Sequence, residues 1–176
     1  MFAKRHRFTA RGQVTGAAGA RRETPWRLPA VLFAVSVAVN YVWEVAQSPL
    51  YAGMERFGLV LWHCLLASLG DGLLVLLIFA AGWAAFGSRD WFERPGAKGY
   101  LLMLSAGFAV AAAVELAALS LGFWEYRETM PRLPALGLGL APLAQMLVLP
   151  PLVFFVVGRL RRRRVEVDET TAGLRR

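Results

Sequence analysis

The stretch LVLWHCLLASLGDGLLVLLIFAAGWAAF, residues 59–86, decides the fold that we expect for this chain. It contains one acid, Asp71, and one histidine, His63, but no lysine or arginine. A run of about 20 apolar residues is enough for a helix to cross the hydrocarbon layer of a bilayer. The stretch is longer than that, so it predicts a transmembrane helix that tilts or projects beyond the lipid.

Three further apolar stretches, residues 30–47, 100–121 and 135–157, are also long enough to span a membrane. The whole chain is 57% hydrophobic and has a mean hydropathy of +0.46. A soluble domain of 176 residues cannot usually bury that much apolar surface. The sequence therefore predicts an all-α integral membrane protein that forms a bundle of four transmembrane helices.

The distribution of charge predicts how the chain crosses the membrane. All but three of the 20 lysines and arginines lie in the N-terminal tail, in the loop between the second and third spans, or after Gly158. Loops rich in lysine and arginine stay in the cytoplasm, so we expect a multi-pass protein of the plasma (inner) membrane with both termini cytoplasmic. The expected organisation is a disordered basic N-terminal tail over residues 1–27, a four-span domain over residues 28–158 and a basic cytoplasmic C-terminal tail over residues 159–176.

Composition also excludes two classes of function. The net charge of +8 could suggest a nucleic acid partner, but the basic residues flank apolar spans and do not form a folded basic face. We expect the run Arg161–Arg164 to anchor the chain on anionic lipid headgroups instead. The single cysteine, Cys64, excludes an internal disulfide and a two-cysteine redox relay.

We expect the first span to be retained and not cleaved as a signal peptide. Ala46-Gln47-Ser48 resembles the small residues of a cleavage site. However, a long basic segment precedes the span, and the polar group from Asn40 to Glu44 interrupts what should be a plain apolar core.

Every span carries polar residues in its outer half, the half away from the predicted cytoplasmic side. From the helical rise of 1.5 Å per residue, Glu44 and His63 should lie roughly 5 Å below the outer surface and Asp71 about 18 Å below it. The spacing of four, four and three residues on the first span places its polar residues along one helical stripe. The polar residues are Ser36, Asn40, Glu44 and Gln47 on the first span, His63 and Asp71 on the second, Glu115 on the third and Gln145 on the fourth.

The three intramembrane acids have no lysine or arginine within the spans to neutralise them. A charged side chain at the membrane centre costs at least ~2.5–3.5 kcal/mol, so protonation, water or a bound cation or cationic substrate has to compensate. A histidine exchanges protons near neutral pH, so His63 could pass a proton to a carboxylate. Membrane interiors rarely keep three acids for packing alone, and the sequence therefore predicts a working site.

Aromatic residues gather at the outer boundary of the predicted spans. Amphipathic rings settle at this depth in most membrane proteins, which is the simpler interpretation. They could also form the walls of a ligand site and would suit a positively charged group. These residues are Trp43, Trp62 and Trp124 together with Tyr41, Tyr51 and Tyr126.

Two prolines in the fourth span, Pro150 and Pro151, lack the amide hydrogens that a helix needs there. The backbone carbonyls of Met146 and Leu147 are therefore left without their usual donors. We expect a kink at which a serine or threonine of a neighbouring helix bonds to these carbonyls. The alternative is that the carbonyls serve as acceptors in the site.

The leading functional hypothesis is acid–base chemistry on a lipid-soluble or amphipathic small molecule. The expected catalytic residues are Asp71, Glu115, His63 and Glu44. The expected substrate-binding residues are Asn40, Trp43, Trp62, Trp124, Tyr126 and Gln145. No spacing typical of a metal site joins these residues, so no metal is predicted, and the sequence does not name a cofactor.

Two alternatives stay open. The protein could be a proton- or cation-binding carrier or an accessory subunit of a membrane transport complex, or the polar residues could form a network used only for packing. An enzyme predicts a deep apolar pocket beside the acids within one chain, whereas a carrier predicts a wet path through the inner half. The expected partners are membrane lipid, a lipid-soluble small molecule and a second copy or membrane complex. Small residues that could form such a contact are Gly107, Ala111, Ala112, Gly137 and Gly139.

Overall fold

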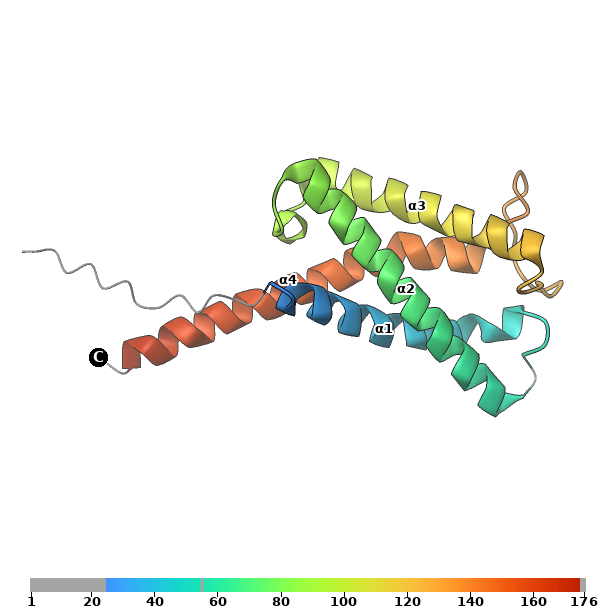
Figure 1. Ribbon diagram of the computed structural model, residues 1–176, viewed down its shortest axis with the longest axis horizontal. Helices are drawn as coiled ribbons and strands as arrows, with labels where there is room; N and C mark the ends of the chain where they lie inside the picture. Colours follow the sequence, from blue (N-terminus) through green and yellow to red (C-terminus); the bar gives the residue numbers. More distant parts are fainter. Residues whose placement is uncertain (1–24, 55, 175–176) are drawn as a thin grey trace, which may run out of the picture.

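The chain forms four long α-helices joined by short connections (Figure 1). The computed structural model describes residues 25–54 and 56–174, and all statements below concern this part of the chain. The helices are α1 (Arg27–Gln47), α2 (Phe57–Phe86), α3 (Gly96–Leu121) and α4 (Leu140–Leu174), with 3-10 turns η1 (Ser48–Leu50) and η2 (Trp91–Glu93).

All four long helices are long and apolar enough to cross a membrane, so the predicted all-α four-span bundle is confirmed. The apolar windows are Arg27–Leu50, Gly58–Phe86, Gly96–Leu121 and Leu140–Arg164. The N-terminal tail expected to be disordered lies outside the described residues as far as residue 24.

The fourth helix differs from the prediction at both ends. It begins at Leu140 and not at Ala135, because Gly137 has a φ of +68° and Arg132 pairs with Gly139 in an isolated β-bridge. These features form a turn that a helix cannot include. At the other end the helix continues through the arginines to Leu174, since arginine and glutamate are good helix formers and no glycine or proline interrupts the segment before Gly173.

The helices pack as a chain of neighbours and not as a square. α1 contacts both α2 and α4, and α4 also contacts α3. The contact between α2 and α3 is the least extensive of the packed helix pairs: the two helices meet at the loop of residues 87–95 and diverge from there (Figure 1). This divergence creates the space in which the candidate site lies.

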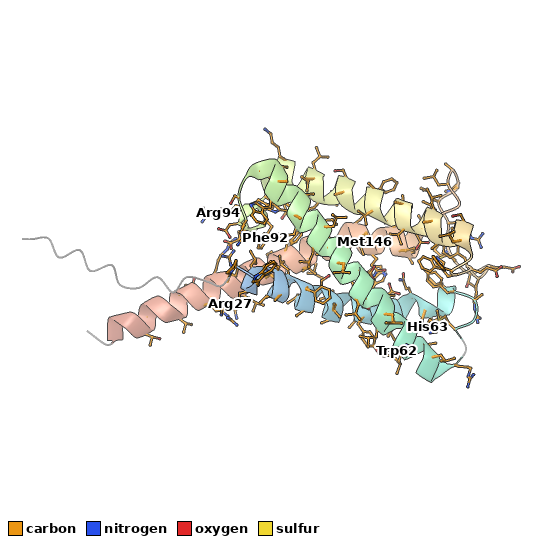
Figure 2. All side chains as sticks on the ribbon, viewed as in Figure 1. Arg27, Trp62, His63, Phe92, Arg94 and Met146 are labelled. Atoms are coloured by element: carbon orange, nitrogen blue, oxygen red, sulfur yellow. The ribbon has the colours of Figure 1, made fainter. Side chains whose placement is uncertain are left out.

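We call the end of the bundle that carries Arg27, residues 87–95 and Arg159–Arg164 the basic end. Figure 2 shows Arg27, Phe92 and Arg94 at this end, far from Trp62 and His63 at the other. A tightly packed apolar core fills it. The core includes Leu32, Val75, Ile78, Trp91, Phe92, Met103, Val153, Phe154 and Val157.

Trp91 closes this core from the loop. Its indole nitrogen donates to the Phe79 carbonyl oxygen at 3.1 Å, and its ring lies so close to Gly82 that a β-carbon there would meet it at 2.1 Å. Arg161 of α4 binds the same loop, with N–O distances of 2.5 Å to Asp90 and 2.7 Å to Glu93. Arg161 therefore forms ion pairs within the chain, a role that the predicted anchoring of Arg161–Arg164 on lipid headgroups did not include.

We call the opposite end, made of residues 48–54 and 122–139, the cap end. Its two loops are joined by backbone hydrogen bonds from Ala52 to Glu125 and from Arg127 to Leu50, both 2.9 Å long. Tyr51, Tyr126 and Met130 pack together beneath this junction. The two loops therefore form one cover over the ends of the helices.

Glycine allows α3 and α4 to approach closely at Gly107. A β-carbon at Gly107 would lie 2.2 Å from the carbonyl oxygen of Met146, so one Cα hydrogen of this glycine points at that oxygen. Pro150 deprives this carbonyl of its helical donor, and the weak Cα–H donor of Gly107 faces it instead of the expected serine or threonine.

The close approach at Gly107 also affects the prediction that small residues form an interface between two copies of the chain. Gly107 and Ala111 are buried between α3 and α4 of one chain, so they are not available to a second copy. The steric reason is that the proline-containing segment of α4 needs a neighbour without a side chain. Association with a second copy through other surfaces stays a prediction.

Candidate functional site

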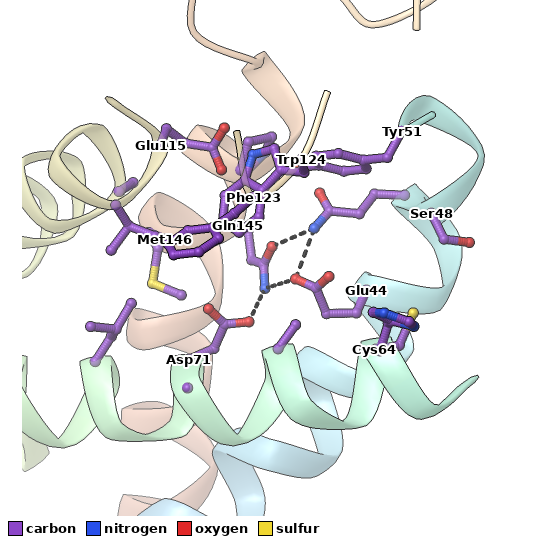
Figure 3. Close-up of a pocket in the computed structure, with 18 of the residues that line it drawn as sticks. Glu44, Ser48, Tyr51, Cys64, Asp71, Glu115, Phe123, Trp124, Gln145 and Met146 are labelled. Carbon is purple, nitrogen blue, oxygen red and sulfur yellow. Dashed lines mark hydrogen bonds between the residues drawn. The ribbon is translucent and has the colours of Figure 1, made fainter. Parts of the chain in front are cut away.

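A cavity of about 460 Å³ lies between the diverging parts of α2 and α3, toward the cap end (Figure 3). All four helices contribute to its wall, and residues of both cap loops cover it. The lining residues are Glu44, Gln47, Ser48, Tyr51, Met54, His63, Cys64, Ala67, Gly70, Asp71, Leu74, Ala111, Val114, Glu115, Phe123, Trp124, Pro142, Gln145 and Met146. A volume of this size suits a small organic ligand.

Gln145 of α4 is the centre of the polar network in this cavity. Its side-chain nitrogen lies 2.9 Å from Asn40 Oδ1, 2.9 Å from Glu44 Oε1 and 2.8 Å from Asp71 Oδ2. Its side-chain oxygen accepts a hydrogen bond of 2.9 Å from Gln47, which also donates to Glu44 at 2.8 Å. One glutamine thus joins polar groups of α1, α2 and α4 (Figure 3).

This network has fewer donors than acceptors. The amide group of Gln145 carries two hydrogens, but three oxygens lie within hydrogen-bond distance of its nitrogen. Two of those oxygens belong to carboxyl groups, those of Glu44 and Asp71. A pair of ionised carboxylates so close together in a buried setting repels strongly, so a proton shared by the pair or a bound cation is needed.

Glu115 approaches the cavity from α3 and is held by the cap. Tyr126 donates a hydrogen bond from its hydroxyl to Glu115, and the same hydroxyl accepts one from the Gly139 amide at 3.0 Å. Figure 3 shows the indole nitrogen of Trp124 beside the Glu115 carboxyl. This nitrogen is buried and interacts electrostatically with the Glu115 carboxyl, but within the described chain no acceptor lies in hydrogen-bond geometry with it. Glu115 is therefore fixed in place, while Trp124 retains a donor for a ligand.

His63 lies at the rim of the cavity on α2. Its Nδ1 is 2.7 Å from the Leu59 carbonyl oxygen. A carbonyl oxygen can only accept, so Nδ1 carries a hydrogen, and in the neutral ring the lone pair is then on Nε2. The residue lines the cavity and is also exposed, so its ring is accessible from outside the cavity.

The cavity is open on the side between α2 and α3. His63, Ala67 and Gly70 of α2 line it and are nevertheless exposed. On the opposite wall, Val114 of α3 is 37% exposed and Phe123 is 73% exposed. Because the surrounding helix surfaces are apolar, this opening faces the region that lipid would occupy.

The pKa of Tyr51, which lines the cavity on its cap side, is affected by all three acids of the cavity. Burial raises the pKa of its hydroxyl above its usual range, and the charges of Glu115, Glu44 and Asp71 raise it further. All three acids therefore act on one position, as expected for side chains that face a common space.

The structure brings six of the ten predicted site residues to the cavity wall: Glu44, His63, Asp71, Glu115, Trp124 and Gln145. Asn40 and Tyr126 lie behind the wall as hydrogen-bond partners of Gln145 and Glu115. The catalytic and binding roles of these eight residues stay predictions.

Trp43 and Trp62 do not line the cavity. Trp43 donates to the Gln47 side chain at 3.1 Å and supports the network from behind. Trp62 is 58% exposed near the cap end of α2 (Figure 2). Both fit the simpler interpretation of the aromatic residues as an interfacial belt.

The sequence did not single out several residues of the wall. Gln47 was visible in the polar stripe of the first span, and its register with Asn40 could have identified it. Tyr51 was named among the aromatic residues that could wall a ligand site, and Met146 only for its backbone carbonyl. Met54 and Phe123 gave no such signal, because only the folding of the cap brings them to the cavity. Among the described residues, no group of three or more His, Cys, Asp or Glu side chains could hold a metal ion.

No protein family, curated protein or solved structure matches this chain. The fold and the cavity therefore define its class: an all-helical membrane protein with four apolar helices and a carboxyl-lined cavity open between two of them.

Proposed function

We propose that this protein performs acid–base chemistry on a lipid-soluble or amphipathic small molecule within the cavity. The observation that carries the proposal is the convergence of Glu44 and Asp71 on one neutral amide nitrogen in a space open toward lipid. A carboxyl pair that shares one proton contains both an acid and a base. Such a pair can donate a proton at one position of a substrate and accept one from another.

The remaining groups have supporting roles in this proposal. Asp71 is the group that faces the substrate, while Gln145 orients both carboxyl groups. His63, with its free Nε2 at the rim, returns protons between the pair and the outside. Glu115 is a second acid on the opposite wall, oriented by Tyr126.

The proposal includes an orientation in the membrane. The basic end carries Arg27, the loop of residues 87–95 and the arginines of α4, and positively charged segments stay on the cytoplasmic side. The basic end would then face the cytoplasm in the plasma (inner) membrane. The cavity would lie in the outer half of the bilayer and receive its substrate sideways from the lipid.

A carrier that moves ions across the membrane has less support. Such a carrier needs a polar path on both sides of the carboxyl groups. Between the cavity and the basic end lies the apolar core that includes Val75, Phe79 and Met103. A role as an accessory subunit, or a network that serves packing alone, would leave the cavity without an occupant.

Native mass spectrometry of the purified protein, followed by analysis of the released small molecules, tests the proposal. We compare wild type with Asp71→Asn, with Ala67→Phe, which fills the cavity, and with Glu128→Gln, a matched charge change at an exposed cap residue. Wild type and Glu128→Gln should retain the same small molecule, and the other two variants should lose it. Identical retained compounds in all four proteins would refute a ligand site here.

A second measurement addresses the chemistry. The recovered compound is incubated in D₂O with wild-type protein and with Asp71→Asn. Proton transfer to and from a carbon atom should bring deuterium into a C–H position that does not exchange without protein. Equal exchange with both proteins, or none with either, would contradict the acid–base role of the pair.

A further inference from the structure

The cavity has a one-sided electrostatic character. Three helices each contribute one acid to its wall: Glu44 from α1, Asp71 from α2 and Glu115 from α3. No lysine or arginine lines it within the described chain. A ligand with an anionic head would meet three carboxyl groups and no compensating cation.

The hydrogen bonds of the three carboxyl groups also favour a ligand that donates hydrogen bonds. Each of the three carboxyl groups accepts from a side chain of the protein, namely Gln145 for Glu44 and Asp71 and Tyr126 for Glu115. The Gln145 amide is nevertheless shared among more oxygens than it has hydrogens. A ligand with several N–H donors would supply what the Glu44–Asp71 pair lacks.

One wall of the cavity is aromatic. Tyr51 and Trp124 meet edge to face with ring centroids 6.3 Å apart, and Phe123 continues this wall toward the opening. The faces of such rings attract cations, most strongly where water is excluded. The aromatic wall thus favours the same kind of head group as the carboxyl groups do.

The Trp124 side chain favours a ligand that contains a hydrogen-bond acceptor. Its buried indole N–H lies beside Glu115 and interacts with it electrostatically, but no acceptor in the part of the chain that the structure describes is in hydrogen-bond geometry with it (Figure 3). A buried donor without a well-aligned acceptor is unfavourable. A hydroxyl group on the ligand could accept from Trp124 and donate to Glu115 at the same time.

We infer that the ligand is an amphipathic amino alcohol whose ammonium group binds between Glu44 and Asp71, whose hydroxyl group binds at Trp124 and Glu115, and whose hydrocarbon tail leaves between α2 and α3. The inference rests on the proposed function, because it names the substrate class of the same cavity. The apolar residues Leu74, Val114 and Met146 line the space that the first part of the tail would fill.

Three probes of equal chain length test this inference. They are 2-amino-1-octanol, 1,2-octanediol, in which a hydroxyl group replaces the amine, and octanoate. Each is titrated against detergent-solubilised protein near pH 7, where the amine is protonated. Native mass spectrometry counts complexes with one bound probe.

Wild type should bind 2-amino-1-octanol at least about tenfold more tightly than the diol, and octanoate should not compete. The double variant Glu44→Gln, Asp71→Asn keeps the shape of both side chains and should lose the preference for the amine. Glu128→Gln should behave as wild type. Far-UV circular dichroism of each variant checks that the helices are intact.

The outcomes separate this inference from the proposal on which it rests. If the diol binds as tightly as the amino alcohol and Ala67→Phe abolishes both, the cavity is a ligand site but the ammonium assignment is wrong. If binding of every probe is unchanged by Ala67→Phe, the probes do not enter the cavity and both the inference and the proposed site fail.

Discussion

Substitution of Gly107 by alanine should separate α3 from α4 and destabilise the protein. The new β-carbon would lie 2.2 Å from the Met146 carbonyl oxygen, whereas ordinary contacts begin at 3.4 Å. The obstructing atom belongs to the backbone of α4 and cannot rotate away, so the helices must part by about 1 Å. Overpacking of this kind costs about 3 kcal/mol, and the better helix propensity of alanine returns about 1 kcal/mol. We therefore expect a net loss of about 2 kcal/mol in the free energy of unfolding.

The matched control is Gly158→Ala in α4. Its β-carbon would meet Glu93 at 3.8 Å, which is an ordinary contact, so this variant should gain up to about 1 kcal/mol. Unfolding by SDS in mixed lipid–detergent micelles, followed by circular dichroism, gives the free energy of both variants. Equal stability of the two variants would refute the close α3–α4 contact and, with it, the account of how Pro150 is accommodated.

Three further predictions concern other contacts. Gln145→Leu should lower the free energy of unfolding by about 3 kcal/mol in the same micelle assay, because it leaves Asp71 and Asn40 without this donor and Glu44 with Gln47 alone. A neutral effect would contradict the central role of this glutamine. Trp91→Ala should cost about 3–5 kcal/mol, since it empties the core at the basic end, and unchanged stability would contradict that packing. Arg161→Ala should cost less than about 1 kcal/mol but speed amide hydrogen exchange in residues 90–93, and unaltered exchange there would show that the ion pairs do not hold the loop.

The structure also gives a physical reason for the position of the cavity in the bundle. The basic end is closed by large side chains that pack around Trp91, and the close contact at Gly107 draws α3 onto α4. α2 is held by α1 instead. The two helices therefore diverge toward the cap, and the polar residues on their facing sides cannot be covered by apolar packing.

Much of the fold followed from local features of the chain. The length of each apolar stretch predicted four spans, and three of the four helices end at or begin near the expected residues. The fourth helix was placed too early, because the apolar residues 135–139 have the hydropathy of a span but the backbone of a turn. Hydropathy reflects the free energy of transfer into lipid and does not determine the backbone dihedral angles of these residues.

The candidate site was only partly visible in the sequence. The helical period placed Asn40, Glu44 and Gln47 on one stripe, and counting residues placed this stripe and Gln145 in the same half of the bundle. Counting could not reveal that a single amide of Gln145 serves three side chains, or that Trp62 points away from the cavity. Those facts depend on which helices pack together.

The sequence by itself determined that the chain forms four apolar helices and that each carries polar residues toward the same end, since both properties depend on composition and on the regular rise of a helix. Only the tertiary structure decided which of these residues meet. Helix pairing depends on contacts between residues far apart in the chain, such as Gly107 with Met146 and Tyr51 with Tyr126. A cavity exists where such contacts are missing, and no local pattern records a missing contact.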